Sequence, residues 1–448
     1  MKITPIILAA GQGTRMHSSL PKVLHPILGR PMVWYALEAA QEVTETKPVV
    51  VIGHGAEGVR QVLGDTVQFV WQEQRLGTGH AAQQAEPVLR GETDLVLVTS
   101  ADMPLITSET LSRLVDAQTS HAGPITMLTV VLVDPHGFGR VIRADSGQVA
   151  AIIEEAQASP EQRSVRELNA GVYCFSADWL WPALKRVELS PKGEYYLTDL
   201  VGIAAAEGRS VQAIRLEDPT EMIGVNTRVH LAEATAIMQQ RINRKWMLAG
   251  VSIVDPNATY IEPGITIGRD TVIWPNTYLQ GETQVGESCV LGPNTIIRDT
   301  QLGNRCQVFA SVLETAVVED DVDIGPFGHL RKGAHLAQGV HIGNFGEVKN
   351  SYLGPGTKMG HFSYVGDTST GPNVNIGAGT VTCNYDGEHK HPTKIGANVF
   401  IGSDTMLVAP LNIGDGSRTG AGSVVTKDVP SNTLVVGAPA RAIRKLGA

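Results

Sequence analysis

The hydrophobic positions in the second half of the chain recur with a period of six residues. Between residues 261 and 425, aliphatic side chains fall six positions apart over three runs, and glycine often follows directly. These runs comprise Ile261, Ile267, Ile273, Leu279, Val285, Leu291 and Ile297, then Val318, Ile324, Leu330, Leu336, Ile342 and Val348, then Ile395, Ile401, Leu407 and Ile413. A hexapeptide period is typical of a parallel β-helix, in which each unit supplies one short strand and one turn. We therefore predict a β-helix of hexapeptide repeats for this half.

Residues 1 to about 227 lack this period and instead alternate short apolar runs with helix-like stretches. Such alternation predicts an α/β fold. The expected strands are 5–10, 48–52, 67–72, 94–99, 125–133, 141–143, 149–154, 170–175 and 211–215. The expected helices are 32–42, 57–63, 79–86 and 109–119.

Residues 228–249 contain neither glycine nor proline, and they predict one long helix between the two halves. The predicted organisation is therefore an α/β domain over 1–227, a linker helix over 228–249 and a β-helix domain over 250–448.

Composition narrows the classes of function. The formal net charge is −9 and no long basic run is present, so nucleic acid is not an expected partner, whereas small anions need only a local basic pocket. The cysteines show no CxxC spacing, which predicts neither a disulfide framework nor a zinc site. The apolar stretch at the N-terminus is about seven residues long, too short for a signal peptide or a membrane span. We expect a cytoplasmic protein.

A glycine-rich segment, LAAGQGTRM at 8–16, follows the first expected strand. Its glycines let backbone N–H groups approach a phosphate, and Arg15 adds positive charge. It is neither a dinucleotide fingerprint, because Met16 stands where a third glycine is needed, nor a Walker A loop. Taken alone, the segment fits a tight turn better than a phosphate site.

Further motifs change that balance. A second glycine-rich loop, QEQRLGTGH, follows another strand at 72–80, and Lys22 follows a proline close to the first loop. Asp102 ends an apolar strand, where a carboxylate is placed to hold a metal ion. Gly139, Asn169 and Asn226 also lie at or near strand ends.

Together these motifs resemble the sugar-phosphate nucleotidylyltransferases, and the resemblance covers the whole N-terminal domain. It implies a Rossmann-like α/β fold and transfer of a nucleotide from UTP to a sugar phosphate. It also implies roles for individual residues: Leu8, Ala9, Ala10, Gly11, Gln72, Gly77 and Thr78 for uracil and ribose, Ser100 and Ala101 beside them, Arg15 and Lys22 for the triphosphate, Asp102 and Asn226 for Mg²⁺, and Gly139, Glu154 and Asn169 for the sugar.

Two polar segments, 331–350 and 360–396, interrupt the apolar period of the β-helix, whose core needs none of their side chains. Residues 383–394, CNYDGEHKHPTK, predict a loop that leaves the coil, and such loops often carry function. His361 lies near Glu347, Lys349 and Tyr364 in sequence. An amine must be neutral to attack a thioester, and an imidazole with a pKa near 7 suits the removal of its proton.

The segments GHFSYVGD at 360–367 and NIGAGTVTCNYDG at 375–387 closely resemble the acetyltransferase half of the bifunctional GlmU family. That family joins the same nucleotidylyltransferase domain to a left-handed β-helix in the same order, and it forms homotrimers. The resemblance implies acetylation of glucosamine 1-phosphate by acetyl-CoA, then coupling to UTP, giving UDP-N-acetylglucosamine for cell-wall and lipopolysaccharide precursors. It implies these roles: His361 as general base, Glu347 as its orienting partner, Arg331 and Lys349 for the sugar phosphate, Tyr364, Asn375 and Lys390 for the sugar, Asn384 and Tyr385 at the transfer site, and Ala378, Ser403 and Ala421 for acetyl-CoA.

Two other classes of protein share this domain order. In one, as in the ADP-glucose pyrophosphorylase type, the β-helix only assembles or regulates; His361 and the Asn384–Tyr385 loop disfavour it. In the other, as in translation-factor exchange subunits, the whole protein is a non-catalytic scaffold; Arg15, Lys22 and Asp102 disfavour that one.

Overall fold

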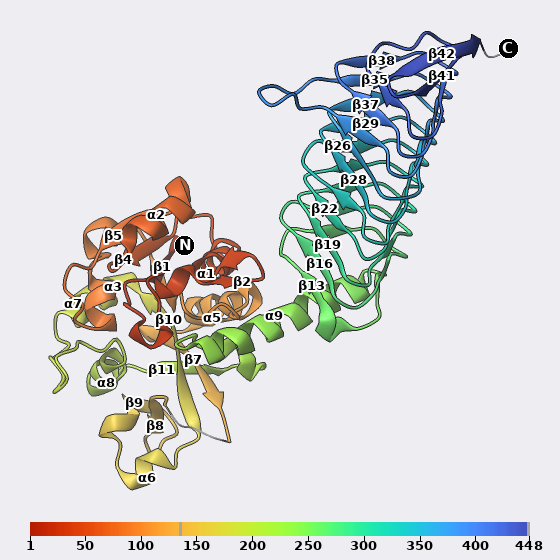
Figure 1. The fold of residues 1–448 in the computed structure, drawn as a ribbon. Coiled ribbons are helices and arrows are strands. Elements are labelled where there is room, and N and C mark those ends of the chain that lie inside the picture. Colours follow the sequence, from red (N-terminus) through yellow and green to blue (C-terminus); the bar gives the residue numbers. More distant parts are fainter. Residues whose placement is uncertain (134–136, 446–448) are drawn as a thin grey trace. The chain divides into compact units, whose positions relative to one another are not determined.

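The computed structural model describes residues 1–133 and 137–445, and the chain divides into two compact units, Met1–Met238 and Gln239–Ala448 (Figure 1). The division falls inside the helix α9 (Arg228–Leu248). The bounds of α9 confirm the long helix predicted over 228–249 to within one residue. Across the part of the chain that is described, no helix combines the length and apolar character needed to cross a membrane.

The first unit is an α/β fold built on one mixed sheet. Its strands are β1 (Ile3–Leu8), β4 (Val49–Ile52), β5 (Gln68–Trp71), β6 (Leu95–Ser100), β7 (Ile125–Val131), β8 (Arg140–Arg143), β9 (Val149–Ile153), β10 (Glu167–Ser176) and β11 (Val211–Arg215), with a small separate hairpin of β2 (Pro26–Ile27) and β3 (Arg30–Pro31). The order is β11-β7-β10-β6-β1-β4-β5, and β8 and β9 form a hairpin attached through β10. The strands β5, β4, β1 and β6 run parallel, whereas β10 is antiparallel to both of its main neighbours.

Helices cover both faces of this sheet. They are α1 (Met32–Gln41), α2 (Ala56–Leu63), α3 (Thr78–Gln83), α4 (Glu86–Leu89), α5 (Ser108–Ser120), α6 (Pro160–Arg163), α7 (Ala177–Leu184) and α8 (Asp199–Ala206), with short 3₁₀ turns η1 (Thr14–Met16), η2 (Lys22–Leu24), η3 (Gly64–Thr66), η4 (Glu155–Gln157) and η5 (Pro219–Met222). Ile7 of β1 packs in one core cluster with Val33 of α1. Its neighbour Ile6 packs in another cluster with Ala81 of α3. Because successive strand residues face opposite sides, strands buried on both faces read as unbroken apolar runs.

The predicted strands all have counterparts in the structure. One predicted helix was wrong in detail, and three helices were not predicted. The helix expected at 79–86 is two helices, α3 and α4, because Pro87 has no N–H group to donate within a continuous helix and is tolerated only in the first turn of a new one. The helices α6, α7 and α8 were not anticipated. Apolar residues occur on nearly every side of α7 and α8, so neither sequence shows the one-sided apolar stripe on which the prediction depends.

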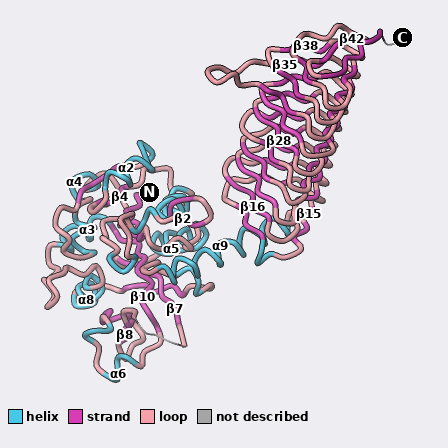
Figure 2. The backbone as a smooth tube through the Cα atoms, in the orientation of Figure 1, coloured by secondary structure: helices cyan, strands magenta, loops and turns pink. Residues whose placement is uncertain are grey.

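The second unit confirms the predicted β-helix: three sheets of parallel strands stack along it, as the strand-coloured trace shows (Figure 2). The first sheet contains β12 (Ser252–Ile253), β15 (Val272–Ile273), β18 (Val290–Leu291), β21 (Gln307–Val308), β24 (Asp323–Ile324), β27 (His341–Ile342), β30 (Lys358–Met359), β33 (Asn375–Ile376), β36 (Phe400–Ile401), β39 (Arg418–Thr419), β41 (Thr433–Gly437) and the antiparallel β42 (Ala440–Lys445).

The other two sheets follow the same coils. The second contains β13 (Thr259–Ile261), β16 (Thr277–Gln280), β19 (Thr295–Arg298), β22 (Val312–Glu314), β25 (His329–Leu330), β28 (Gly346–Lys349), β31 (Ser363–Gly366), β34 (Val381–Cys383), β37 (Met406–Val408) and β40 (Val424–Val425). The third contains β14 (Thr266–Ile267), β17 (Gln284–Val285), β20 (Gln301–Leu302), β23 (Val317–Val318), β26 (Ala334–Leu336), β29 (Ser351–Leu353), β32 (Thr368–Thr370), β35 (Thr393–Ile395) and β38 (Leu411–Ile413). One 3₁₀ turn, η6 (Pro256–Ala258), precedes β13.

The strand register explains both the period and its slips. Ile261 pairs with Leu279 and Leu279 with Ile297, so three hexapeptides make one coil and equivalent aliphatic side chains stack inside it. Ile297 then pairs with Leu313, although the six-residue spacing fails between them. The slip in the sequence is therefore a coil with shortened corners, through which the sheets continue without a break.

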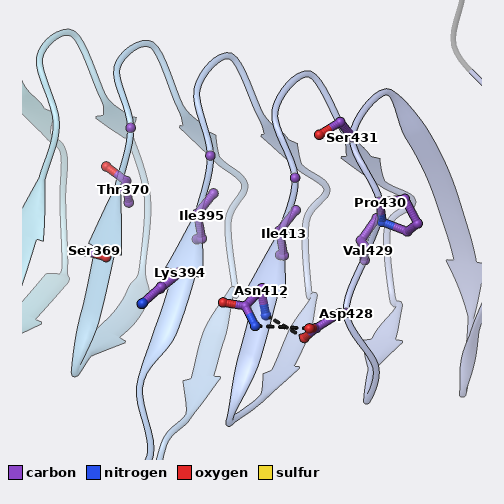
Figure 3. A pocket seen from close by; sticks show the side chains of 13 residues that line it. Ser369, Thr370, Lys394, Ile395, Asn412, Ile413, Asp428, Val429, Pro430 and Ser431 are labelled. Carbon is purple, nitrogen blue, oxygen red and sulfur yellow. Dashed lines mark hydrogen bonds between the residues drawn. The ribbon is translucent and has the colours of Figure 1, made fainter.

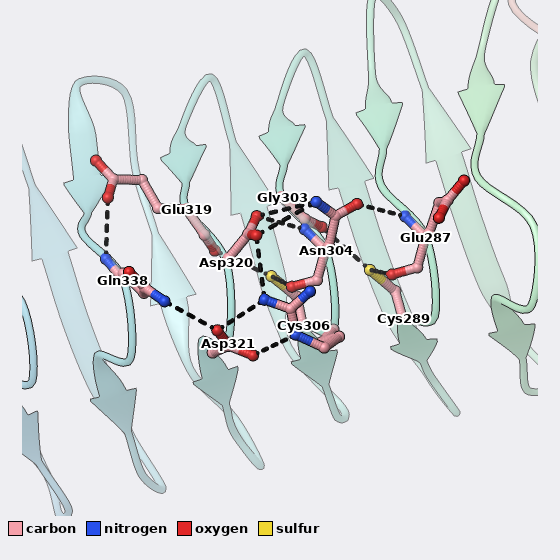
Figure 4. A network of polar contacts seen from close by, with 10 residues as sticks. Glu287, Cys289, Gly303, Asn304, Cys306, Glu319, Asp320, Asp321 and Gln338 are labelled. Carbon is pink, nitrogen blue, oxygen red and sulfur yellow. Dashed lines mark hydrogen bonds and ion pairs between the residues drawn. The ribbon is translucent and has the colours of Figure 1, made fainter.

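Carboxylate and amide side chains at the corners bind backbone N–H groups of the preceding coil. Asp428 accepts hydrogen bonds from the backbone and the side chain of Asn412 at 2.8 and 3.0 Å (Figure 3). Asn304 in the same way accepts from the N–H of Glu287 at 2.9 Å (Figure 4). These bonds satisfy donors that the turning backbone leaves outside the sheets.

The same network holds charges at a corner. Arg305 contacts Asp320 at 3.2 Å and Asp321 at 2.6 Å (Figure 4). Hydrogen bonding to Arg305 lowers the pKa of Asp321 to about 2. These three side chains are exposed to solvent, so their ion pairs contribute little to the free energy of unfolding and mainly fix the conformation of the corner.

Two amide side chains of α9 close the first coil of the β-helix. Gln239 donates to the carbonyls of Pro256, Asn257 and Thr259 at 3.2, 3.0 and 2.8 Å. Asn243 donates to the carbonyls of Pro256 and Thr259 at 2.8 and 2.9 Å. Both amides are buried, so they satisfy carbonyl groups that water does not reach.

We expect Gln239→Ala to lower the free energy of unfolding of the second unit by about 1–3 kcal/mol, because it leaves buried carbonyl groups without donors. The measurement is equilibrium unfolding in urea. Gln240→Ala is the control, since Gln240 is exposed on the same helix. Equal stability of the two variants would contradict the capping role of Gln239.

Candidate functional sites

The first glycine-rich loop lies where two central parallel strands end. Leu8 at the end of β1 pairs with Ser100 at the end of β6, and the N–H of Ala101 donates to the carbonyl of Leu8 at 3.0 Å. The segments 8–11 and 100–102 are therefore neighbours at the carboxyl edge of the sheet, where ligands bind in open α/β folds. Ala9 and Ala10 are buried, whereas the space beside the Gly11 Cα is open.

Lys22, Asp102 and Asn226 meet beside this loop. The Lys22 ammonium contacts the Asp102 carboxylate directly and lies 3.1 Å from Asn226 Oδ1. The Lys22 and Asp102 side chains are only 11% and 19% exposed. A Cβ on Gly13, whose φ is +67°, would lie 2.5 Å from the Lys22 Cβ, so glycine is needed for the loop to pass this lysine.

Asp102 and Asn226 fit a divalent cation. Their side-chain oxygens both contact one cationic group, which in this structure is the Lys22 ammonium. The backbone N–H of Val225 donates to the Asp102 carbonyl at 2.8 Å, so the segments that carry Asp102 and Asn226 are held together. Mg²⁺ prefers such oxygen donors and takes one or two protein ligands together with substrate phosphates. The described residues include no group of three or more His, Cys, Asp and Glu side chains placed to hold a metal.

The second glycine-rich loop lies against the first. Arg75 donates to the side chain of Gln12 across the two loops, a contact that no sequence signal indicated. Gln72 is buried and donates to the Gly77 carbonyl at 3.1 Å, which orients its amide. The hydroxyl of Thr78 accepts from a backbone N–H of the segment before α8 at 3.1 Å. Arg15 is exposed on η1.

The structure brings Gly139, Glu154 and Asn169 together. The Asn169 N–H donates to the Gly139 carbonyl at 2.9 Å, and a Cβ on Gly139 would lie 3.6 Å from Glu154 Oε1. Burial raises the pKa of Glu154, whose carboxylate accepts from Thr198 at 3.4 Å. Asn169 Oδ1 accepts from the Tyr173 hydroxyl at 2.9 Å, so its NH₂ group is the side left for a ligand. Thr198 and Tyr173 carry no motif, and sequence reasoning missed them.

In the β-helix, three basic side chains gather on the second sheet and the projecting loop. Arg331 pairs with Glu347 at 2.8 Å, one coil further on. Lys349 lies against Lys390, whose charge and hydrogen bonding lower the pKa of Lys349. Two ammonium groups this close repel each other until an anion lies between them. A cluster of this charge is suited to an anion.

Tyr364 and Asn384 adjoin this cluster. The Tyr364 hydroxyl and the Asn384 amide both lie over Gly366, where a Cβ would come within 2.3 and 2.8 Å of them. Asn384 also donates to Asp367, which accepts from Asn350 at 2.6 Å. Asp367 thus holds the base of the projecting loop, and sequence reasoning did not single it out.

His361 stands in line with the small residues expected to meet acetyl-CoA. Met359 pairs with Ile376 and Ile376 with Ile401, which places His361, Ala378 and Ser403 at equivalent corner positions of successive coils. Ala421 continues the row, since a Cβ on Gly402 would lie 2.8 Å from its backbone nitrogen. His361 is exposed. A row of small residues that begins at an exposed imidazole leaves room for an extended ligand to present its reacting end there.

Not every expected residue joins these groups. Asn375 lies on β33 of the first sheet, whereas Tyr364 lies on β31 of the second, so within one chain they face different sides of the coil. Tyr385 is 60% exposed on the projecting loop, which leaves the coil between β34 and β35 (Figure 1). A groove of about 560 Å³ on the third sheet, lined by Lys394, Asn412 and Asp428 among others, contains none of the expected residues (Figure 3).

Comparison with known proteins covers both units. A MobA-like NTP transferase domain matches residues 5–173, and bacterial transferase hexapeptide repeats match residues 264–299 and 392–427. The chain is 47% identical to the bifunctional protein GlmU of Heliobacterium modesticaldum over 97% of this chain and 95% of that protein. It is 46% identical to that of Pelobacter propionicus (97% and 95%) and 45% identical to that of Streptococcus agalactiae serotype V (96% and 94%).

Proposed function

Because the chain belongs to the family of bifunctional GlmU proteins, we propose that its two units catalyse consecutive steps in the synthesis of UDP-N-acetylglucosamine. The second unit transfers the acetyl group of acetyl-CoA to glucosamine 1-phosphate. The first unit then couples N-acetylglucosamine 1-phosphate to UTP and releases pyrophosphate. The observation that carries the proposal is that both groups of polar residues are present on one chain that matches these relatives over nearly its whole length.

In uridylyl transfer, a phosphate oxygen of the sugar phosphate attacks the α-phosphorus of UTP, and pyrophosphate leaves. Such a step needs alignment and charge neutralisation more than covalent chemistry. Arg15 and Lys22 bind the triphosphate. Asp102 and Asn226 would hold Mg²⁺, which would neutralise charge on the phosphate oxygens. The Lys22 ammonium, which pairs with Asp102 in this structure, supplies its charge to a phosphate.

The remaining expected residues of the first unit select the substrates. The loop 8–11 and the segment 100–101 lie against the nucleoside, together with Gln72, Gly77 and Thr78. Gly139, Glu154 and Asn169 bind the sugar. The closeness of Gly139 to Glu154 and Asn169 supports this role, because it brings the three expected residues to one place.

In acetyl transfer, the amine of glucosamine 1-phosphate attacks the thioester carbonyl, and the thiol of CoA leaves. His361 removes the proton that the amine loses, and Glu347 orients His361. Arg331 and Lys349 bind the sugar phosphate through charge-assisted hydrogen bonds. Lys390, expected on the sugar side, joins them in this proposal because it lies against Lys349. The other expected residues line the sugar and acetyl-CoA: Tyr364, Asn375, Asn384, Tyr385, Ala378, Ser403 and Ala421.

The two half-reactions are tested separately. Pyrophosphate release from UTP and N-acetylglucosamine 1-phosphate measures the first unit, and thiol release from acetyl-CoA and glucosamine 1-phosphate measures the second. Pyrophosphate release without thiol release would favour a β-helix that only assembles or regulates. Absence of both would favour a scaffold.

Lys390→Ala is expected to raise the KM for glucosamine 1-phosphate about tenfold and to leave kcat close to wild type, because it removes one charged contact to the bound phosphate. Steady-state kinetics of thiol release measure both constants. Lys394→Ala is the matched control on β35. An unchanged KM would show that Lys390 does not bind the phosphate.

We further propose that the β-helix units assemble as a homotrimer that completes the acetyl transfer site. Phe327, Phe345 and Phe362 occupy one corner of successive coils and are 57%, 58% and 57% exposed, and the first two rings stack at 5.1 Å. An exposed apolar row of this kind marks an association surface. The separation of Asn375 from Tyr364 within one chain agrees with a site that two subunits share.

Sedimentation is expected to show a trimer for the wild type, and Phe345→Glu is expected to lower the trimer fraction and acetyl transfer together. Val131→Glu, a similar change at an exposed position of β7, should leave both unchanged. A monomer fully active in acetyl transfer at the assay concentration would rule out a shared site.

A further inference from the structure

Arg140, the first residue of β8, carries a buried charge that the proposed chemistry does not use. Its side chain is 1% exposed. A buried guanidinium is costly unless its charge is paired and its N–H groups are bonded. The contacts of Arg140 therefore show which groups compensate its buried charge.

The guanidinium joins three segments. One NH₂ group donates to the Phe138 carbonyl, the other lies 3.3 Å from Glu155 Oε1, and Nε donates to the Arg163 carbonyl at 3.4 Å. Glu155 returns to the same loop, because its Oε2 accepts from the Gly137 N–H at 2.6 Å. Arg140 and Glu155 thus fasten the loop 137–139 to the turn that begins at Glu154.

The contacts of Arg140 and Glu155 involve the direct sequence neighbours of two residues that the proposal assigns to the sugar. Gly139 stands between Phe138 and Arg140, and Glu154 directly precedes Glu155. Gly139 and Glu154 face each other closely enough that a Cβ on the glycine would lie 3.6 Å from the carboxylate. A shift of either segment by an ångström would change the space between them.

We propose that Arg140 and Glu155 are positioning residues for uridylyl transfer. Their ion pair sets the separation of Gly139 and Glu154 and so fixes the shape of the site that binds the sugar of N-acetylglucosamine 1-phosphate. The inference rests on the proposed uridylyl transfer and deepens it, since it assigns the sugar specificity of that site to a pair that does not touch the substrate.

The test compares Arg140→Met with Arg140→Lys and with the control Arg143→Met. Arg143 is on the same strand and pairs with Glu167 at 2.7 Å, but its side chain is 40% exposed. Arg140→Met is expected to raise the KM for N-acetylglucosamine 1-phosphate about tenfold or more, with kcat and the KM for UTP close to wild type. Arg140→Lys, which retains a charge for Glu155, should recover part of the loss. Arg143→Met should match the wild type.

Acetyl transfer by the same molecules is the internal control, because the second unit reports the amount of intact enzyme. A loss of kcat with both KM values unchanged, in step with a lowered melting temperature, would overturn the proposal and leave Arg140 a purely structural residue. Where Arg140→Met does not fold, Glu155→Gln is judged by the same KM criterion. Failure of the proposed function is distinguishable, since the wild type itself would then release no pyrophosphate.

Discussion

Asp102→Ala is expected to lower uridylyl transfer by about a thousandfold or more and to leave acetyl transfer unchanged. Asp102 ends β6 beside the glycine-rich loop, and its carboxylate with the Asn226 amide forms the pair of oxygens that fits Mg²⁺. Removing it takes away the anionic ligand and leaves the Lys22 ammonium without its carboxylate partner. The measurement is the rate of pyrophosphate release at saturating UTP, N-acetylglucosamine 1-phosphate and Mg²⁺.

Two controls separate this effect from damage to the fold. Asp145→Ala removes an exposed carboxylate from the turn between β8 and β9 and should match the wild type in both reactions. The melting temperature of Asp102→Ala shows whether the first unit remains folded. A folded Asp102→Ala variant that releases pyrophosphate at nearly the wild-type rate would remove Asp102 from the site.

His361→Ala is expected to reduce acetyl transfer by about a hundredfold or more, which is the usual contribution of a positioned general base. Uridylyl transfer should stay at the wild-type rate, because its residues belong to the other unit. The alternative is that His361 only stabilises its corner, in which case activity and melting temperature should fall together. Thiol release, pyrophosphate release and a thermal melt of one variant distinguish the two cases.

His335→Ala is a suitable comparison for His361→Ala. His335 lies on β26 of the third sheet, pairs with Glu319 at 2.8 Å and is a half-exposed histidine of the same β-helix. Near wild-type acetylation by folded His361→Ala would mean that the base is elsewhere, and His335, His341, His389 and His391 would be the next residues to replace.

Local pattern was sufficient to predict most of the fold. The stacked aliphatic residues of the β-helix must recur at a fixed spacing because each lies on its equivalent in the next coil, as Ile261 does on Leu279. The strands of the first unit are buried on both faces and so read as apolar runs. The pattern failed for α7 and α8, because a helix with apolar residues on nearly every side has no polar face to reveal its period.

The site residues divide in the same way. Residues that belong to a fixed motif, such as those of the loop 8–16, carried a signal in the sequence. Residues that act through tertiary contact did not: Tyr173 orients Asn169, and Arg140 joins segments that are adjacent only in the folded chain. The separation of Asn375 from Tyr364 likewise appears only when strands are assigned to sheets.

The most direct test of the account supplies one preparation of the enzyme with glucosamine 1-phosphate, acetyl-CoA labelled in the acetyl group, UTP and Mg²⁺. The account predicts that the label appears first in N-acetylglucosamine 1-phosphate and then in UDP-N-acetylglucosamine. It also predicts that Asp102→Ala stops at the first product and that His361→Ala slows formation of both. If the wild-type enzyme forms no labelled UDP-N-acetylglucosamine from glucosamine 1-phosphate, the claim that one chain carries both activities is contradicted.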